Sequence, residues 1–345
     1  MIELLRLIKL VGLSHLIKLK RAKFFGEGVI RGYFLTRTIS TLFNIGLFDA
    51  LRNENKVDLK LFCQKKNLNK IILKALCDYL YSLKILEKEE ANYFLSRDGK
   101  LLIDVLQGFF DIAYAYEDVF HSLEPLIKME EEFGKGVRRR EEFVAKGSGQ
   151  AAELLPFPIV KDTIKRRNFK TILDLGCGDA TFLIDLCESN PHIKGYGVDI
   201  SQDAVNYGLR KLKERKLDDR ITLLVGDMFK VDKIKEQLKQ IDVATAFYAL
   251  HEFISPETNK VEEFLRKFRE VFQDTPLIIC ELVRESPEIV RKNPSFALEH
   301  YLFHDLSNQR QIPRDEWKEI LKKTGFIHIE EEYVNFAKVG IYVVS

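Results

Sequence analysis

The sequence predicts an α/β protein in which a helical domain comes first and a mainly parallel sheet covered by helices follows. Two changes in pattern predict this order. From about residue 34 to residue 107 apolar residues recur at helical spacing, whereas after Lys170 short apolar runs alternate with helical stretches. Strands and helices that alternate in this way are typical of a parallel sheet with helices on both faces. We expect three parts, which are residues 1–110, 111–150 and 151–345.

Composition and charge are those of a globular protein with two unlike parts. Of the 345 residues, 46% are hydrophobic and 31% are charged, which excludes a disordered or collagen-like chain. The formal net charge of +2 argues against a nucleic-acid-binding surface over the whole molecule. The first 110 residues hold 19 basic against 11 acidic side chains and the remainder holds 35 against 41, which suggests two units with different roles.

Cysteine usage and hydropathy predict a protein of the reducing cytoplasm. Five cysteines without a CxxC pair favour neither a disulfide framework nor a cysteine zinc site. No apolar stretch reaches the roughly 18–20 residues that span a bilayer, so we expect no membrane partner. We interpret residues 1–23 as an amphipathic helix that docks on the protein or on a second copy, with a membrane-surface helix as the alternative.

Three helices and a short hairpin are expected in the first domain. Apolar residues recur at helical spacing in residues 39–51, 59–67 and 70–86, and residues 88–102 suggest brief extended pieces around a polar turn. This order is that of a winged helix, a module that binds DNA through one helix or serves as a dimerisation or lid module. Because the candidate recognition helix carries few basic residues, a DNA-binding regulator is the remote alternative.

A long helical connection with a basic loop is expected over residues 111–150. Glycines flank the cluster that holds Arg138, Arg139 and Arg140. A glycine-flanked basic loop beside a catalytic domain suits an anionic substrate, so these arginines are candidate substrate clamps. An exposed, charged helix end is the structural alternative.

Seven strands are expected in the last domain. Their residues are 171–176, 194–200, 221–226, 241–250, 276–282, 326–334 and 337–344. Only two residues separate the last two strands, so these two must be antiparallel to each other.

A glycine turn follows the first of these strands. In TILDLGCGDATF the apolar run contains Asp174, and Gly176 and Gly178 permit a tight turn that lets backbone N–H groups approach a ligand. This turn, which comes between a strand and a helix, is a candidate cofactor-binding loop.

Further polar residues end the second and third strands. Asp199 stands where a carboxylate accepts the hydroxyls of a ribose. Asp227 suits an exocyclic adenine amine, and Met228 and Phe229 suit the face of the ring. Because carboxyl ends of parallel strands meet at one edge of a sheet, these residues predict a nucleoside site there.

The acidic character of this edge favours S-adenosylmethionine over NAD. The sequence GCGDAT lacks the third glycine of a dinucleotide fingerprint, and Asp179 would repel a pyrophosphate. S-adenosylmethionine has no phosphate and carries two cationic groups. Asp174 is expected to hold its amino end.

ILDLGCGDATF, YGVDIS and VGDMF resemble the first three motifs of class I S-adenosylmethionine-dependent methyltransferases. The resemblance implies a methyltransferase with a Rossmann-like seven-stranded sheet whose last strand is antiparallel, and with S-adenosylmethionine as cofactor. IGLFDAL and LSRDGKLL resemble the dimerisation domain of small-molecule O-methyltransferases, which implies a winged-helix domain, a homodimer and no nucleic-acid partner. The segment Gly147–Gly149 is expected to close over the cofactor.

The sequence FYALHEF ends the fourth strand and offers a base. In plant-type O-methyltransferases a histidine in a similar His-Asp-Trp context is the general base, and here Glu252 and Phe253 replace the second and third residues. The resemblance implies a metal-free O-methyltransferase in which His251 deprotonates a hydroxyl.

A second resemblance points to a metal. His300 and His304 are four residues apart, on one face of an expected helix, and with His251 they form a candidate iron or zinc site. FYALHEF, LEHYLFHD and the basic loop are similar to the 2-oxo acid C-methyltransferases. This resemblance implies C3-methylation of a 2-oxo acid through a metal-bound enolate. The implied ligands are His251 and His300, with His304 in reserve and Glu252 as a further ligand or base.

Overall fold

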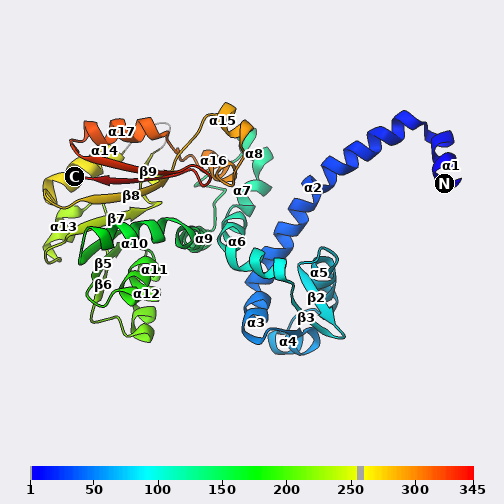
Figure 1. Cartoon of the computed structure of the whole chain (residues 1–345), viewed down its shortest axis with the longest axis horizontal. Coiled ribbons are helices and arrows are strands. Elements are labelled where there is room, and N and C mark those ends of the chain that lie inside the picture. Colours follow the sequence, from blue (N-terminus) through cyan, green and yellow to red (C-terminus); the bar gives the residue numbers. More distant parts are fainter. Residues whose placement is uncertain (1, 255–259) are drawn as a thin grey trace. The chain divides into compact units, whose positions relative to one another are not determined.

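The computed structural model describes residues 2–254 and 260–345 (Figure 1). The chain divides into two compact units, residues 1–114 and residues 115–345. The sequence predicts a separate connection over residues 111–150, whereas most of that stretch belongs to the second unit. None of the helices in the described part of the chain is long and apolar enough to cross a membrane.

The first unit consists of helices around a small antiparallel sheet with the order β1-β3-β2. Asp58 and Asn69 begin two of the helices because their side chains accept hydrogen bonds from backbone N–H groups in the first turn. The expected hairpin is formed by β2 and β3, which pair antiparallel. The elements are α1 (Ile2–Val11), α2 (Leu13–Asn44), α3 (Leu47–Glu54), β1 (Val57–Asp58), α4 (Leu59–Lys66), α5 (Lys70–Ser82), β2 (Leu86–Glu89), β3 (Asn92–Leu95) and α6 (Arg97–Ala115).

The second unit contains the predicted seven-stranded sheet, with the order β6-β5-β4-β7-β8-β10-β9. The pairs from β6 to β8 are parallel, and β10 is antiparallel to both β8 and β9, which confirms the predicted antiparallel end. The strands are β4 (Thr171–Leu175), β5 (Lys194–Asp199), β6 (Ile221–Val225), β7 (Val243–Phe247), β8 (Leu277–Leu282), β9 (Ile329–Val334) and β10 (Val339–Val344).

Helices cover both faces of this sheet. Neighbouring strand residues such as Ile278 and Ile279 belong to two different buried clusters, because successive side chains point to opposite faces. One cluster includes α13, α14 and α17, and the other includes α10, α11 and α12. The helices are α7 (Glu117–His121), α8 (Leu123–Ile127), α9 (Glu141–Leu154), α10 (Pro156–Arg166), α11 (Thr181–Ser189), α12 (Gln202–Arg215), α13 (Val231–Glu236), α14 (Val261–Val271), α15 (Pro287–Lys292), α16 (Ala297–Leu306) and α17 (Arg314–Lys323).

Three local predictions are wrong. The expected long helical connection is broken into the end of α6, the short helices α7 and α8, a loop and α9. Gly147 and Gly149 lie inside α9, where acidic residues of the first turn favour the helix, so they do not form a closing loop. The expected fourth strand stops at Phe247, because Tyr248 adopts a left-handed conformation with φ 50° and turns the chain.

Candidate active site

The glycine turn after β4 is held by Asp199 at the end of β5. Gly176 and Gly178 both have positive φ, 74° and 54°, so the turn uses the backbone freedom that glycine provides. One carboxylate oxygen of Asp199 accepts the N–H of Gly178 at 2.8 Å, and the other accepts the N–H of Ser201 at 2.8 Å. Asp199 therefore joins the turn to the start of the next helix.

Asp174 lies in β4 and is almost completely buried, with 2% of its surface exposed. Burial raises the pKa of its carboxyl to about 7, the nearby charge of Asp199 adds to the rise, and a hydrogen bond from Thr245 opposes it. The Thr245 hydroxyl donates that bond at 2.7 Å. The carboxyl is therefore poised to gain or lose a proton near neutral pH.

The residues after β6 form the third part of this edge. Asp227 accepts the N–H of Phe229 at 3.0 Å and lies 3.7 Å from the ammonium group of Lys230. Met228 is buried in a core cluster, and the half-buried Phe229 ring packs edge-on against Phe253 at 4.4 Å between ring centroids. Since β4, β5 and β6 are adjacent in the sheet, the structure brings their polar ends to one edge.

The charge of Asp179, which was expected to repel a pyrophosphate, is paired in the structure. Asp179 accepts hydrogen bonds from the Lys211 ammonium group at 2.9 Å and from the Thr181 hydroxyl at 2.6 Å. The lysine offsets the charge that would repel a phosphate. The missing third glycine still argues against a dinucleotide.

His251 lies in the short 3-10 helix η1 (Leu250–Phe253) and is held by a buried glutamate of β8. Its Nδ1–H donates to the Glu281 carboxylate at 2.6 Å, and the Leu250 N–H donates to the other Glu281 oxygen at 2.8 Å. Glu281 has no exposed surface. Burial of the ring lowers the pKa of His251, but the Glu281 charge and hydrogen bond outweigh burial and raise it overall.

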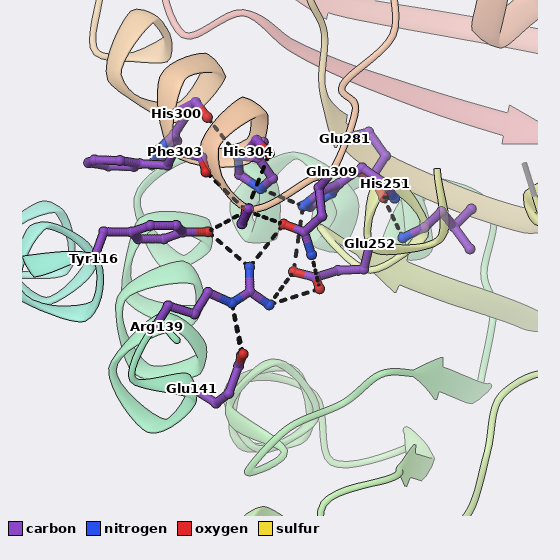
Figure 2. Close-up of polar contacts among 12 residues, drawn as sticks. Tyr116, Arg139, Glu141, His251, Glu252, Glu281, His300, Phe303, His304 and Gln309 are labelled. Atoms are coloured by element: carbon purple, nitrogen blue, oxygen red, sulfur yellow. Dashed lines mark hydrogen bonds and ion pairs between the residues drawn. The ribbon is translucent and has the colours of Figure 1, made fainter. Parts of the chain in front are cut away.

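The side chain of His304, and not that of His300, lies within hydrogen-bond distance of the His251 ring. The two Nε2 atoms of His251 and His304 lie 2.9 Å apart (Figure 2). The Nδ1–H of His304 donates to the His300 carbonyl oxygen at 2.6 Å, one turn earlier in α16. Burial, followed by the charge of His251, lowers the pKa of His304 well below its usual range. The same causes lower the pKa of His300 to about 4.

These contacts determine what the two facing nitrogens can do. A carboxylate and a carbonyl only accept hydrogen bonds, so each Nδ1 must carry a proton. In the neutral rings both Nε2 atoms then present lone pairs to each other. Either a proton shared between them or a metal cation satisfies this arrangement, and metal-bound histidines characteristically donate their other N–H in this way.

Glu252 completes a cluster that could hold a metal ion. Ligand atoms of His251, Glu252 and His304 lie within 4.8 Å of one another. His300, the predicted first partner of His251, does not belong to this cluster among the residues that the structure describes. Two histidines and one carboxylate suit iron and zinc.

The three candidate arginines have different surroundings. Arg139 reaches into the cluster, with 7% of its side chain exposed, and binds Glu252. Arg140 pairs with Glu117 and Asp118 instead. Arg138 is exposed. Only Arg139 therefore lies beside the histidines.

Sequence reasoning missed Glu281, Gln309 and Tyr116, all of which take part in this network. Glu281 left a signal, because it is a charged residue inside the otherwise apolar run PLIICEL and a buried charge needs a partner. The sequence gives no such signal for Gln309 and Tyr116, since polar residues in loops and tyrosines at helix ends are common.

Residues 167–325 match the protein family described as "Methyltransferase domain". Two curated relatives align over most of the chain. A "Methyltransferase ungE'" of Aspergillus campestris is 19% identical over 88% of this chain and 91% of the relative. A "2-ketoarginine methyltransferase" of Streptomyces arginensis is 21% identical over 86% of both chains.

The fold is also that of solved methyltransferases. Human N-acetylserotonin methyltransferase in complex with S-adenosylmethionine superposes with a TM-score of 0.69 at 14% identity, over 94% of this chain and 97% of that one. At this identity the likeness concerns the fold alone.

Proposed function

Since the chain is a class I S-adenosylmethionine-dependent methyltransferase, we propose that it methylates C3 of a 2-oxo acid at a metal centre formed by His251, Glu252 and His304. The observation that carries this proposal is the pair of facing Nε2 atoms on His251 and His304. The Nδ1–H group of each ring already donates to an oxygen, on Glu281 for His251 and on His300 for His304. The relative named 2-ketoarginine methyltransferase, whose name specifies a 2-oxo acid, supports this class of acceptor.

The proposed cofactor site is the edge formed by the ends of β4, β5 and β6. The glycine turn at Gly176 and Gly178, with Asp199 beside it, is suited to the methionine part and the ribose. Asp227 is suited to the adenine amine. Asp174 is suited to the ammonium group, since a cation would favour the ionised form of its carboxyl.

The residues of the cluster fit a metal ion of the iron or zinc type. His251, His304 and Glu252 would hold it. A bound ion would act as a Lewis acid that makes the C3–H of a 2-oxo acid more acidic. The chain's own residues supply the rest: Glu281 orients His251, and the burial of both rings shields their nitrogens from water.

The acceptor is tested directly with labelled cofactor. The full chain is incubated with methyl-labelled S-adenosylmethionine and a panel of 2-oxo acids and phenols, and the labelled product is analysed by NMR. Label on C3 of a 2-oxo acid, lost when a chelator removes the metal, supports the proposal. Label on oxygen, with no effect of the chelator, contradicts it.

A metal-free O-methyltransferase is the second candidate, favoured by the contact between His251 and Glu281. A buried carboxylate on Nδ1 makes the ring a stronger base at Nε2, which suits proton removal from a hydroxyl. In this candidate the Nε2 atom of His304 accepts a hydrogen bond from the His251 ring once that ring has taken up the proton, and no ion is bound.

The exposed side chains of α2 support a homodimer formed through the first unit. Phe24, Phe25 and Tyr33 are exposed by 91%, 78% and 71%. Large apolar surfaces of this kind mark interaction sites. A second copy of the chain is the proposed partner. The proposed winged helix, formed by α3, α4, α5, β2 and β3, would then serve dimerisation rather than DNA binding.

A further inference from the structure

Glu252 is held by two side chains from distant parts of the second unit. The Arg139 guanidinium donates through one nitrogen to both Glu252 oxygens, at 2.9 Å to Oε2 and 3.2 Å to Oε1. The Gln309 amide donates to Oε2 at 2.5 Å. Oε1 lies 3.9 Å from Nε2 of His251. Figure 2 shows the arginine and the glutamine converging on this carboxylate.

The two holding groups are themselves fixed. Gln309 Oε1 accepts from the Arg139 guanidinium at 2.9 Å and from the Ser307 hydroxyl at 3.1 Å, so its amide nitrogen must point toward Glu252. Arg139 also donates to the Tyr116 hydroxyl at 2.9 Å and to Glu141 at 2.9 Å. Arg139 and Gln309 therefore act as one unit with a single orientation.

We propose that Arg139 and Gln309 are positioning residues that fix Glu252 as the third ligand of the metal centre. This inference rests on the proposed function, because it assumes that the cluster binds a metal ion. It assigns to Arg139 a role different from a substrate clamp.

The geometry gives the physical reason. Oε2 receives the shorter bond from Arg139 and the bond from Gln309, whereas Oε1 receives only the longer Arg139 bond and so keeps a lone pair for an ion. A ligating carboxylate is normally hydrogen-bonded by a second layer of residues that sets its direction. The guanidinium also offsets the repulsion between the Glu252 and Glu281 carboxylates, which lets both lie beside His251 in a largely buried cluster.

Two conservative variants test the inference. Gln309→Leu removes the amide donor, and Arg139→Lys keeps the charge but loses the fork that contacts several partners at once. Arg314→Lys is the matched control, because Arg314 forms a two-bonded pair with Glu331 away from the cluster. Zinc affinity of each full-length protein is measured by competition with a chromophoric chelator, and the cobalt-loaded proteins are compared by visible absorption.

We expect each of the two variants to bind zinc about 10- to 100-fold more weakly and to change the cobalt spectrum, as for lost outer partners of a metal site. The control should do neither. Calorimetric binding of S-adenosylhomocysteine should stay unchanged in all three and shows that they are folded. Zinc affinity and cobalt spectra that match the unmodified chain in both variants overturn the inference alone. An unmodified chain that binds neither ion overturns the proposed metal centre and the inference together.

Discussion

The Nε2 atom of His251 lies 2.9 Å from the Nε2 atom of His304, although 53 residues separate the two in the chain. Each ring donates its Nδ1–H to an oxygen that can only accept, on Glu281 for one and on His300 for the other. Two neutral rings cannot satisfy this approach without a proton or a cation between them. The pair is therefore the feature on which the proposed chemistry depends.

Removal of His304 should abolish metal binding, whereas removal of His300 should not. His304→Ala deletes a nitrogen that faces His251, and His300→Ala leaves that nitrogen and the His300 carbonyl in place. In His304→Ala we expect zinc affinity to fall by more than 100-fold, because the loss of an outer partner of a metal site already costs about 10- to 100-fold. In His300→Ala we expect zinc affinity to stay nearly unchanged. Metal analysis of both proteins checks this, and equal metal content in the two would contradict it.

Replacement of Glu281 by glutamine should weaken the site without affecting the cofactor. The amide can present an N–H to His251 Nδ1, which would move the ring proton to Nε2 and remove the lone pair there. We expect about 10- to 100-fold losses in metal affinity and kcat, with unchanged calorimetric affinity for S-adenosylhomocysteine. Glu285→Gln is the control, because Glu285 accepts a hydrogen bond from Tyr333 instead. An active Glu281→Gln protein with normal metal content would refute the proposed role.

Asp174→Asn should change how stability depends on pH. The pKa of Asp174 is about 7 in the folded chain, above the ordinary value of 3.8, so the folded state retains a proton that the unfolded state loses. As pH rises from about 4 to about 7, the free energy of unfolding of the wild-type chain falls by on the order of a few kcal/mol. The asparagine variant, which has no carboxyl at this position, does not show this fall.

The difference in Tm between the two proteins without ligand measures this effect. The variant should exceed the wild type by more at about pH 8 than at about pH 5, since the carboxyl is ionised only at the higher pH. Thr245 donates to Asp174, and asparagine retains an acceptor for that bond. A Tm difference that does not change with pH would mean that Asp174 keeps an ordinary pKa.

Asp199→Ala should weaken cofactor binding. Asp199 holds the N–H groups of Gly178 and Ser201, and its position suits the ribose hydroxyls. Charge-assisted hydrogen bonds of this kind predict an affinity loss of about 10- to 100-fold for S-adenosylhomocysteine by calorimetry. Asp203→Ala changes an exposed aspartate in the first turn of the next helix and should leave the affinity unchanged. An equal loss in both variants would point to a general change in the fold.

Charged residues on α2 should dissociate the proposed homodimer. The double variant Phe24→Glu and Phe25→Glu places two charges on a helix segment whose rings are exposed in the single chain. We expect a dimer for the wild type and a monomer for the variant in analytical ultracentrifugation, because a charge is costly to bury in an apolar interface. A monomeric wild-type chain would exclude the dimer, and an unaltered dimer would place the interface elsewhere.

Local patterns predicted the sheet well. The presence of seven strands and the antiparallel end are confirmed, although the fourth strand is shorter than predicted, because the alternation of short apolar runs with helical stretches reflects burial on both faces of the sheet. The stretch from 111 to 150 was harder, since glycines inside a helix have the same local signature as glycines in a loop. Packing of α9 against the rest of its unit places Gly147 in a helix.

The acidic strand ends, the glycine turn and His251 are visible in the printed chain because each belongs to a short segment with its own pattern. The sequence does not show which of His300 and His304 faces His251, since both lie one turn apart on the same helix. The rotation of α16 about its axis decides this, and that rotation depends on what the helix packs against. Glu281, Arg139 and Gln309 likewise reach the cluster from three separate segments. Side-chain contacts over such separations exist only after the chain has folded, which is why the proposed metal ligands and the residues that hold them could be identified only in the tertiary structure.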